Sequence, residues 1–345
     1  MAQPPIPTHY TGNNQIEPNR RDRAQSSPAR SRPKSPRSKI LNQKYREGRV
    51  PFTPRAKLPK LALLHNAEVH RHGIREAART LLTLAALAHH APALPFAAAL
   101  SEALHGTQAS AVVLDLSTGE VLAAAGKPRR GAPGSTIKPL LLAYALDHGI
   151  VSAGTEVYCR RDLYIGARAL PCTHPADRAV FTAETALAAS CNTWFAEMAR
   201  RFPSPALEAA LAATHLPHAP MDRATVNQRR LAVLGLSGVS ASPLELARAY
   251  RVLLDRLPPG GPVARGLQDS VDYGMAHPAA LPGLIILGKT GTAGDPGEPW
   301  THGWFAGAIP GRLVVVIYMP HADGGAAAHL AQIFFRTLTA RDQAR

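Results

Sequence analysis

Three short strings with side chains suited to acyl transfer follow one another along the sequence: Ser135-Thr136-Ile137-Lys138, Ser190-Cys191-Asn192 and Lys289-Thr290-Gly291. A serine hydroxyl becomes a nucleophile when a nearby base takes its proton, and a lysine with a lowered pKa can be that base. Each string is a weak signal alone, because chance supplies several Ser-x-x-Lys patterns in 345 residues. Their order, spacing and flanks together predict a serine acyl-transfer site.

The first string follows a loop-forming segment and precedes an apolar run. Gly131-Ala-Pro-Gly134 is expected to form a loop, and Ser135 is expected to begin a helix that runs to about His148. Lys138 then returns to the serine's face after about one turn, and the positive end of the helix favours an oxyanion formed beside it. A capping Ser with a solvated Lys is the simpler alternative, but Pro139 and three leucines after Lys138 favour a buried lysine.

The second and third strings also place polar groups among apolar neighbours. Ser190 and Asn192 can point into one cleft from a tight turn or helix junction, or be a capping Ser and a surface Asn. The apolar residues on both sides of them favour the cleft, because buried polar groups need partners. Lys289 lies in an apolar strand, where Gly291 indicates either close approach by a ligand or another chain, or an edge-strand bulge.

The elements that must position these strings indicate an α+β fold. A hairpin is expected near the start, helices fill the middle, and strands followed by one amphipathic helix close the chain. The capping box Ser242-Pro-Leu-Glu245 starts one of the helices. We therefore predict an antiparallel sheet built from N- and C-terminal strands and flanked by helices. The expected strands are 111–116, 120–125, 284–293, 302–309 and 312–319, and the other expected helices are 182–201, 205–213 and 324–341.

The chain resembles the transpeptidase domain of penicillin-binding proteins, the serine enzymes related to β-lactamases, whose motifs are SxxK, SxN and KTG. The resemblance rests on Gly134-Ser-Thr-Ile-Lys-Pro139, Ser190-Cys-Asn-Thr-Trp-Phe195 and Gly288-Lys-Thr-Gly-Thr-Ala293. Stretches 113–126, 242–247 and 302–307 are also similar, so the match covers roughly residues 109–340. It implies a β-lactamase-like fold.

The resemblance also implies residue roles. Ser135 would attack the carbonyl of a D-alanyl-D-alanine stem peptide and become acylated, with Lys138 as general base. Ser190 would relay a proton to the leaving amine, and Asn192 would orient the peptide amide. The third motif would bind substrate through Lys289, Thr290, Gly291 and Thr292, with the backbone amides of Ser135 and Thr292 as the oxyanion hole.

The implied activity is D,D-transpeptidation of peptidoglycan stem peptides, with β-lactams as covalent inhibitors. A β-lactamase or β-lactam sensor uses the same acylation parts, but no Glu-x-x-Leu-Asn string is present to position a hydrolytic water. A D,D-carboxypeptidase differs only in the acceptor, and the sequence does not separate it from a transpeptidase. An inactive peptidoglycan-binding scaffold would not need Ser135, Lys138 and Lys289 together.

Residues 1–70 are expected to form a basic disordered arm. The first 60 residues carry 14 Lys and Arg against 3 acidic residues, and they hold few large apolar side chains. Such an arm suits a solvated tail or a contact with the membrane or with cell-wall synthesis proteins. No nucleic-acid-reading module follows it, so no specific nucleic-acid partner is expected.

Residues 71–104 are expected to hold a signal or anchor segment, ahead of a catalytic domain at 105–345. Residues 80–101 contain no Asp, Glu, Lys or Arg and follow three arginines. That length could span a bilayer, but Pro92 and Pro95 interrupt it, so a signal peptide and a buried helix of the domain are alternatives. We expect export to the periplasm or the outer face of the inner membrane.

Three cysteines complete the chemically active residues. Cys159 and Cys172 enclose a 12-residue loop that a disulfide could close in an oxidising compartment, or they are free thiols. Cys191 is interpreted as a small buried residue. No Cys/His spacing resembles a zinc site, so neither a metal nor a cofactor is expected.

Overall fold

The computed structural model describes residues 94–295 and 297–343. These residues belong to the unit Asn66–Arg345. The basic arm and residues 80–93 lie outside the described residues, so what we expect of them stays a prediction. Among the described helices, none has both the length and the apolar character that crossing a bilayer requires.

The centre of the fold is a five-stranded antiparallel sheet with the strand order β2-β1-β9-β8-β7. The N-terminal hairpin pairs with the C-terminal strands through β1 and β9, in the register Ala111↔Ile317. The predicted α+β class and the sheet built from both ends of the domain are therefore confirmed. The strands are β1 (Ser110–Asp115), β2 (Val121–Ala125), β7 (Leu287–Ala293), β8 (His302–Ile309) and β9 (Leu313–Met319).

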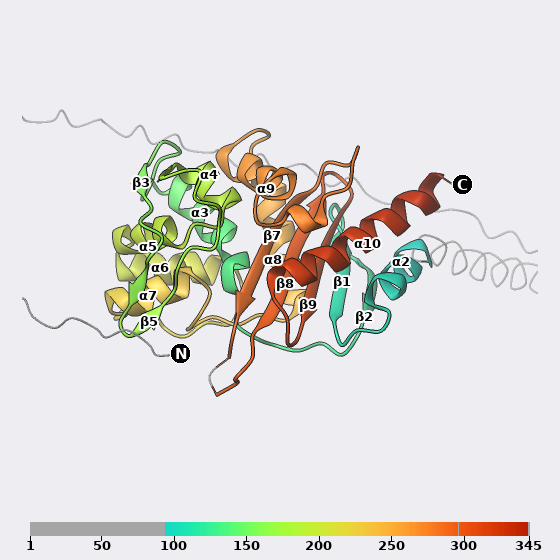
Figure 1. The fold of residues 1–345 in the computed structure, drawn as a ribbon, viewed down its shortest axis with the longest axis horizontal. Helices are drawn as coiled ribbons and strands as arrows, with labels where there is room; N and C mark the ends of the chain where they lie inside the picture. The colour runs from blue at the N-terminus through green and yellow to red at the C-terminus, as the bar shows by residue number, and fades with distance from the viewer. Residues whose placement is uncertain (1–93, 296, 344–345) are drawn as a thin grey trace, which may run out of the picture. The chain divides into compact units, whose positions relative to one another are not determined.

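Alternating side chains of the sheet enter two separate cores. Val113 and Ile317 pack with the apolar side chains of α2 (Leu94–Leu104) and α10 (Gly324–Gln343) on one face. Val112 and Val316 pack with the helical block on the other face. Since successive side chains point to opposite faces, β9 is apolar throughout because both of its faces are covered. Figure 1 shows α10 lying across the sheet and α3 to α7 gathered near β7.

The helical block contains more helices, with more breaks between them, than the sequence predicts. The helix expected over 182–201 is two helices, because Ser190 adopts a left-handed backbone with φ of 54° between them. The capping box at Ser242 forms as predicted. The helices of the block are α3 (Lys138–Asp147), α4 (Ala183–Ala188), α5 (Asn192–Arg201), α6 (Ser204–Ala213), α7 (Val226–Val233), α8 (Pro243–Arg256) and α9 (Pro262–Asp272), with a 3-10 turn η2 at His277–Ala279.

The predicted helix start at Ser135 is also modified. Gly134–Ile137 form a 3-10 turn, η1, and the α-helix begins at Lys138. Pro139 has no N–H, which removes one hydrogen bond from the first turn without cost there. The nucleophile candidate therefore lies on a tight turn that leads into α3.

Between α3 and α4 the chain forms two short two-stranded antiparallel sheets, with the β4–β5 hairpin inserted between β3 and β6. Strand β3 (Val157–Tyr158) pairs with β6 (Val180–Phe181), and β4 (Tyr164–Ile165) pairs with β5 (Arg168–Ala169). This segment carries two of the three cysteines.

Helix α2 contains residues 94–101 of the apolar stretch 80–101. Ala99 and Leu100 are fully buried against the sheet and α10. This part of the stretch is therefore a core helix, the alternative that the sequence left open. The signal or anchor expected ahead of it stays a prediction.

Candidate active site

The backbone of the turn that carries Ser135 is held by four side chains from three distant parts of the chain. The Ala132 carbonyl accepts hydrogen bonds from His302 Nε2 at 2.8 Å and Trp304 Nε1 at 2.9 Å. Asp295 Oδ1 accepts the Ala132 N–H at 3.0 Å, and the buried Tyr250 hydroxyl donates to the Thr136 carbonyl at 2.8 Å. These bonds leave the turn little freedom to move.

Two buried lysines meet at one hydroxyl. Lys138 Nζ lies 3.3 Å and Lys289 Nζ lies 2.8 Å from Ser190 Oγ. Both lysine side chains are 0% exposed. Lys138 also donates to the Ser190 carbonyl at 2.9 Å and to Asn192 Oδ1 at 2.8 Å. The structure thus brings together Lys138, Ser190, Asn192 and Lys289 from all three motifs.

Burial makes these lysines weaker bases than free lysines. Desolvation lowers the pKa of Lys138 to about 8, and negative charge at Cys191 and Cys172 opposes that fall. Desolvation lowers the pKa of Lys289 well below its usual value, and repulsion from Lys138 adds to the effect. Two ammonium groups on one hydroxyl are unfavourable, so the pair releases its first proton readily. A neutral lysine near pH 8 suits general-base catalysis.

Ser190 and Asn192 owe their positions to the break between α4 and α5. The left-handed conformation of Ser190 is uncommon for a residue with a side chain and is typical of functional sites. Asn192 Nδ2 contacts the carbonyls of Leu170 and Pro171, each at 3.4 Å. The second motif therefore touches the hairpin segment that precedes Cys172.

Strand β7 is the edge of the sheet next to η1. A Cβ on Gly291 would lie 2.5 Å from the Pro133 carbonyl oxygen, so only glycine permits this approach. Gly134 packs as closely on Thr292, because a Cβ there would lie 2.9 Å from the Thr292 nitrogen. The close backbone approach that the glycine in the third motif indicates is thus made by the turn that carries Ser135.

The two threonine hydroxyls of β7 have partners outside the lysine cluster. Thr290 Oγ1 donates to the Met275 carbonyl at 3.4 Å, and Thr292 Oγ1 accepts the Gly324 N–H at 2.9 Å. Thr290 is buried and Thr292 is exposed. Their substrate-binding role stays a prediction.

Ser135 is half-buried, and its hydroxyl has no hydrogen bond to Lys138 or to any other described residue. Catalytic hydrogen bonds are often long in structures without substrate. The nucleophile role of Ser135 accordingly rests on its place beside Lys138 and β7, and stays a prediction.

A cavity of about 320 Å³ adjoins the second and third motifs. Its lining includes Ala189, which precedes Ser190, and Met275, whose carbonyl accepts from Thr290. Arg178 and Tyr273 contribute polar groups to the wall. A second cavity of about 370 Å³, between α3, α6 and α8, is lined by none of the motif residues.

Two groups of side chains among the described residues have the composition of a metal site: Asp295, Glu298 and His302, and the set Cys159, Cys172, His174 and Cys191. Asp295 and His302 already bind the Ala132 backbone. The expectation that no metal is bound stays a prediction, but the structure gathers the cysteine set, which no spacing in the sequence indicates. Sequence spacing hides it because the four ligands come from three separate segments.

The sequence reading missed several positioning residues. Tyr250 and Asp295 bind the backbone of the turn that carries Ser135, although they lie 115 and 160 residues after Ser135 in the sequence. No local pattern identifies them, because their partners are backbone atoms of a segment brought near only by folding. Trp304 lies in a stretch already singled out, but its bond to Ala132 was not foreseen.

A family model of the penicillin binding protein transpeptidase domain matches residues 109–340. The chain belongs to this family. The match includes all three motifs and every strand of the five-stranded sheet. No curated protein sequence matches the chain.

Solved transpeptidase structures share the fold. The D,D-transpeptidase domain of a peptidoglycan glycosyltransferase from Eggerthella lenta superposes with a TM-score of 0.64 at 21% identity, over 73% of this chain and 82% of that one. The transpeptidase domain of Burkholderia pseudomallei penicillin-binding protein 3 gives 0.61 at 21%, over 73% and 93%. Pseudomonas aeruginosa PBP2 gives 0.59 at 18%, over 71% and 73%. At these identities the similarity establishes the transpeptidase fold.

Proposed function

We propose that this transpeptidase domain is a serine D,D-transpeptidase that cross-links peptidoglycan stem peptides through an acyl-enzyme on Ser135. The observation that carries the proposal is the pair of buried lysines on Ser190, beside the turn that holds Ser135. A binding module gains nothing from two desolvated ammonium groups, which cost free energy to bury.

The acylation step follows from these positions. Ser135 Oγ attacks the carbonyl carbon of the penultimate D-alanine while its proton passes to a neutral Lys138. The oxyanion would be bound by the backbone N–H groups of Ser135 and Thr292, and the close packing of Gly134 on the Thr292 backbone supports this assignment. The C–N bond then breaks, and Ser190 relays the proton held by Lys138 to the leaving amine: Ser190 gives its hydroxyl proton to the amine and receives a proton from Lys138. In cross-linking, an amine of a second stem peptide releases the acyl group.

The two lysines divide the electrostatic work. A substrate carboxylate beside Lys289 would favour its charged form and raise its lowered pKa. Repulsion from a charged Lys289 would then favour a neutral Lys138. Ser190 Oγ contacts both amines and so provides a path for the proton. Substrate binding would thus prepare the base.

Covalent labelling with a fluorescent penicillin tests the proposal. The purified full chain is expected to form an adduct that survives for an hour, and Ser135→Ala, with an unchanged melting temperature, is expected to form none. The Ser135 hydroxyl is the atom that would become acylated, so its removal leaves no acceptor. Rapid loss of label would instead indicate a β-lactamase, and absence of label on folded wild-type protein would favour the inactive scaffold.

A second measurement separates the two acceptors. The acylated enzyme is incubated with stem peptides that carry or lack a free side-chain amine. Cross-linked product identifies a transpeptidase, whereas release of D-alanine without cross-linking identifies a carboxypeptidase.

The rate of penicillin acylation is expected to rise with pH. Only neutral Lys138 can accept the serine proton, and its neutral fraction grows about tenfold per pH unit below its pKa. With that pKa at about 8, the second-order rate constant should climb from pH 6 and level off above about 8. Stopped-flow acylation at constant ionic strength measures the profile. A rate independent of pH over this range would contradict a lysine base.

We also propose that the protein acts outside the cytoplasm, where its peptidoglycan substrate is assembled, and that the basic residues before residue 60 contact the membrane surface or cell-wall synthesis proteins. The mass of the mature chain isolated from membranes distinguishes a cleaved signal from a retained anchor. A full-length chain found only in the cytosol would contradict the proposed location.

A further inference from the structure

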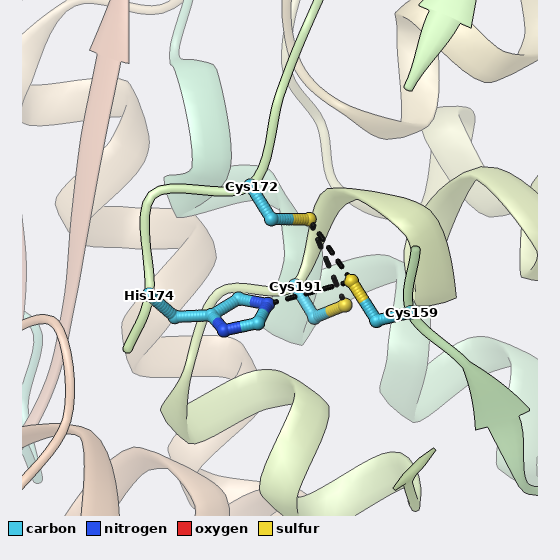
Figure 2. Close-up of side chains that lie close together, drawn as sticks. All are labelled: Cys159, Cys172, His174 and Cys191. Carbon is cyan, nitrogen blue, oxygen red and sulfur yellow. Dashed lines mark hydrogen bonds between the residues drawn. The ribbon is translucent and has the colours of Figure 1, made fainter. Parts of the chain in front are cut away.

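Four buried side chains with soft donor atoms converge beside the second motif. Cys159 follows β3, Cys172 and His174 lie in the segment between β5 and β6, and Cys191 is the residue immediately before α5. They are 5%, 6%, 2% and 0% exposed. Figure 2 shows the three sulfur atoms and the imidazole turned toward one another. The proposed acyl transfer uses none of them.

The distances among these donors fit a tetrahedral metal site. Cys159 Sγ lies 3.5 Å from Cys172 Sγ and 3.6 Å from His174 Nε2, and Cys172 Sγ lies 3.9 Å from Cys191 Sγ. All four donor atoms are within 4.8 Å of one another. A tetrahedral zinc ion with Zn–S of about 2.3 Å and Zn–N of about 2.0 Å separates its ligand atoms by roughly 3.5–3.8 Å.

The separations do not fit a disulfide. A bonded pair of sulfurs lies about 2.05 Å apart, whereas Cys159 and Cys172 are 3.5 Å apart and all three cysteines are free thiols. Buried free cysteines are ordinary core residues. A buried imidazole nitrogen facing them is not explained by core packing.

The hydrogen bonds around the cluster prepare it for a metal. His174 Nδ1 lies 2.8 Å from the Pro175 carbonyl, which can only accept, so the proton is on Nδ1 and the Nε2 lone pair faces the sulfurs. The Thr193 Oγ1 atom accepts from the Cys159 thiol at 3.4 Å and lies 3.6 Å from Cys172 Sγ, so its one proton is available to either sulfur once that thiol is deprotonated. Cys191 adjoins the N-terminus of the ten-residue helix α5, which favours negative charge.

We propose that Cys159, Cys172, His174 and Cys191 bind one Zn²⁺ as a closed structural Cys₃His site. Thiolate ligands in tetrahedral geometry favour zinc over the oxygen-preferring Mg²⁺ and Ca²⁺. Four protein ligands leave no open position for a substrate or water, so the ion is structural. Binding releases the thiol protons, and three thiolates with one neutral imidazole give the site a net charge of −1.

The site ties the hairpin segment to the second motif. Cys191 lies between Ser190 and Asn192, and Asn192 also contacts the two carbonyls that precede Cys172. A zinc ion here would join α5 to the loop over it and hold Ser190 in its left-handed conformation. The four ligands are positioning residues for Ser190. This second role rests on the proposed function, whereas metal binding does not.

Metal content of the full chain tests the site directly. Protein purified without chelators is expected to carry about one zinc per chain by mass spectrometry of the metal. Replacement by Co²⁺ should give the visible bands of tetrahedral cobalt and a sulfur-to-cobalt charge-transfer band. Cys172→Ser and His174→Gln should each reduce the zinc content about tenfold or more. The control His148→Gln removes a histidine with the same Nδ1–carbonyl contact but no thiols nearby, and should keep the zinc.

Further readouts do not depend on the folding of the variants. On wild-type protein, a strong chelator should lower the melting temperature and expose three reactive thiols, and added zinc should reverse both changes. Three results would overturn the proposal. The first is wild-type protein that carries no zinc, and the second is a chain mass lower by two hydrogens, which indicates a Cys159–Cys172 disulfide. The third is a zinc content in His174→Gln equal to that of the wild type. Penicillin labelling of the chelator-treated protein is a separate measurement from its zinc content. The proposal of a zinc site and the proposal of acyl transfer can therefore fail independently.

Discussion

Replacing Lys138 with methionine is expected to slow penicillin acylation by roughly 10²–10⁴-fold, the usual contribution of a general base. Methionine fills much of the same buried volume but cannot accept the Ser135 proton. The Ser190 carbonyl and Asn192 Oδ1 lose a donor, which costs about 1–3 kcal/mol per group. Removal of a buried charge offsets part of that cost. Acylation rates from stopped-flow labelling, with melting temperatures beside them, give the result.

Lys127→Met is the matched control, because Lys127 is the one described lysine outside the site and its side chain is exposed. It should acylate at the wild-type rate. If Lys138→Met acylated within tenfold of wild type, the base would have to be another group, and Lys289, on the same Ser190 hydroxyl, would be the next to test.

Gly235→Ala is expected to destabilise the domain and disable the site together. Gly235 follows α7 with φ of 69°, and a Cβ there would lie 2.0 Å from the Gly134 carbonyl oxygen. Gly134 also donates its N–H to the Gly235 carbonyl at 2.9 Å. The left-handed strain costs about 1–2 kcal/mol and the overpacking about 1–3 kcal/mol. Because Gly134 precedes Ser135, a displaced nucleophile should acylate about 10²-fold more slowly.

The control for this prediction is Gly311→Ala. Gly311 has φ of 71°, but no atom lies within 4 Å of its added Cβ. Its free energy of unfolding should fall only by the cost of backbone strain, about 1–2 kcal/mol, and its acylation rate should equal that of the wild type. Thermal melts and labelling rates of the two variants separate backbone strain from steric displacement. Equal losses in both variants would show that the contact with Gly134 is unimportant.

Those parts of the fold that depend on local pattern could be predicted from the sequence. Strand β8 and the start of α8 lie where periodicity and the capping box place them. A tight turn or helix junction at Ser190 was expected for the second motif, and the break between α4 and α5 agrees with it, although the helix expected over 182–201 runs through this position. The partners of Ser190 at the break, Lys138 and Lys289, are distant from it in sequence, so no local pattern indicates them.

The candidate site shows the same division. The three strings identify Lys138, Ser190, Asn192 and Lys289, and the structure brings these four together. Spacing rules do not indicate the clustering of the three cysteines, because such rules compare residues that are close in the sequence. Here Cys159 and Cys191 are 32 residues apart in the chain and meet only through the packing of α5 on β3.

The pairing of β1 with β9 has a consequence for how the chain folds. This central pair joins residues roughly 200 positions apart, such as Ala111 and Ile317. Closing so long a loop costs entropy before the contact forms, so such topologies fold slowly. During synthesis β1 cannot pair with β9 until almost the whole domain has left the ribosome. Until then its apolar side chains are exposed and prone to aggregation unless another protein covers them. The cysteine cluster spans a short stretch in the middle, so a bound metal could organise that region before the sheet is complete.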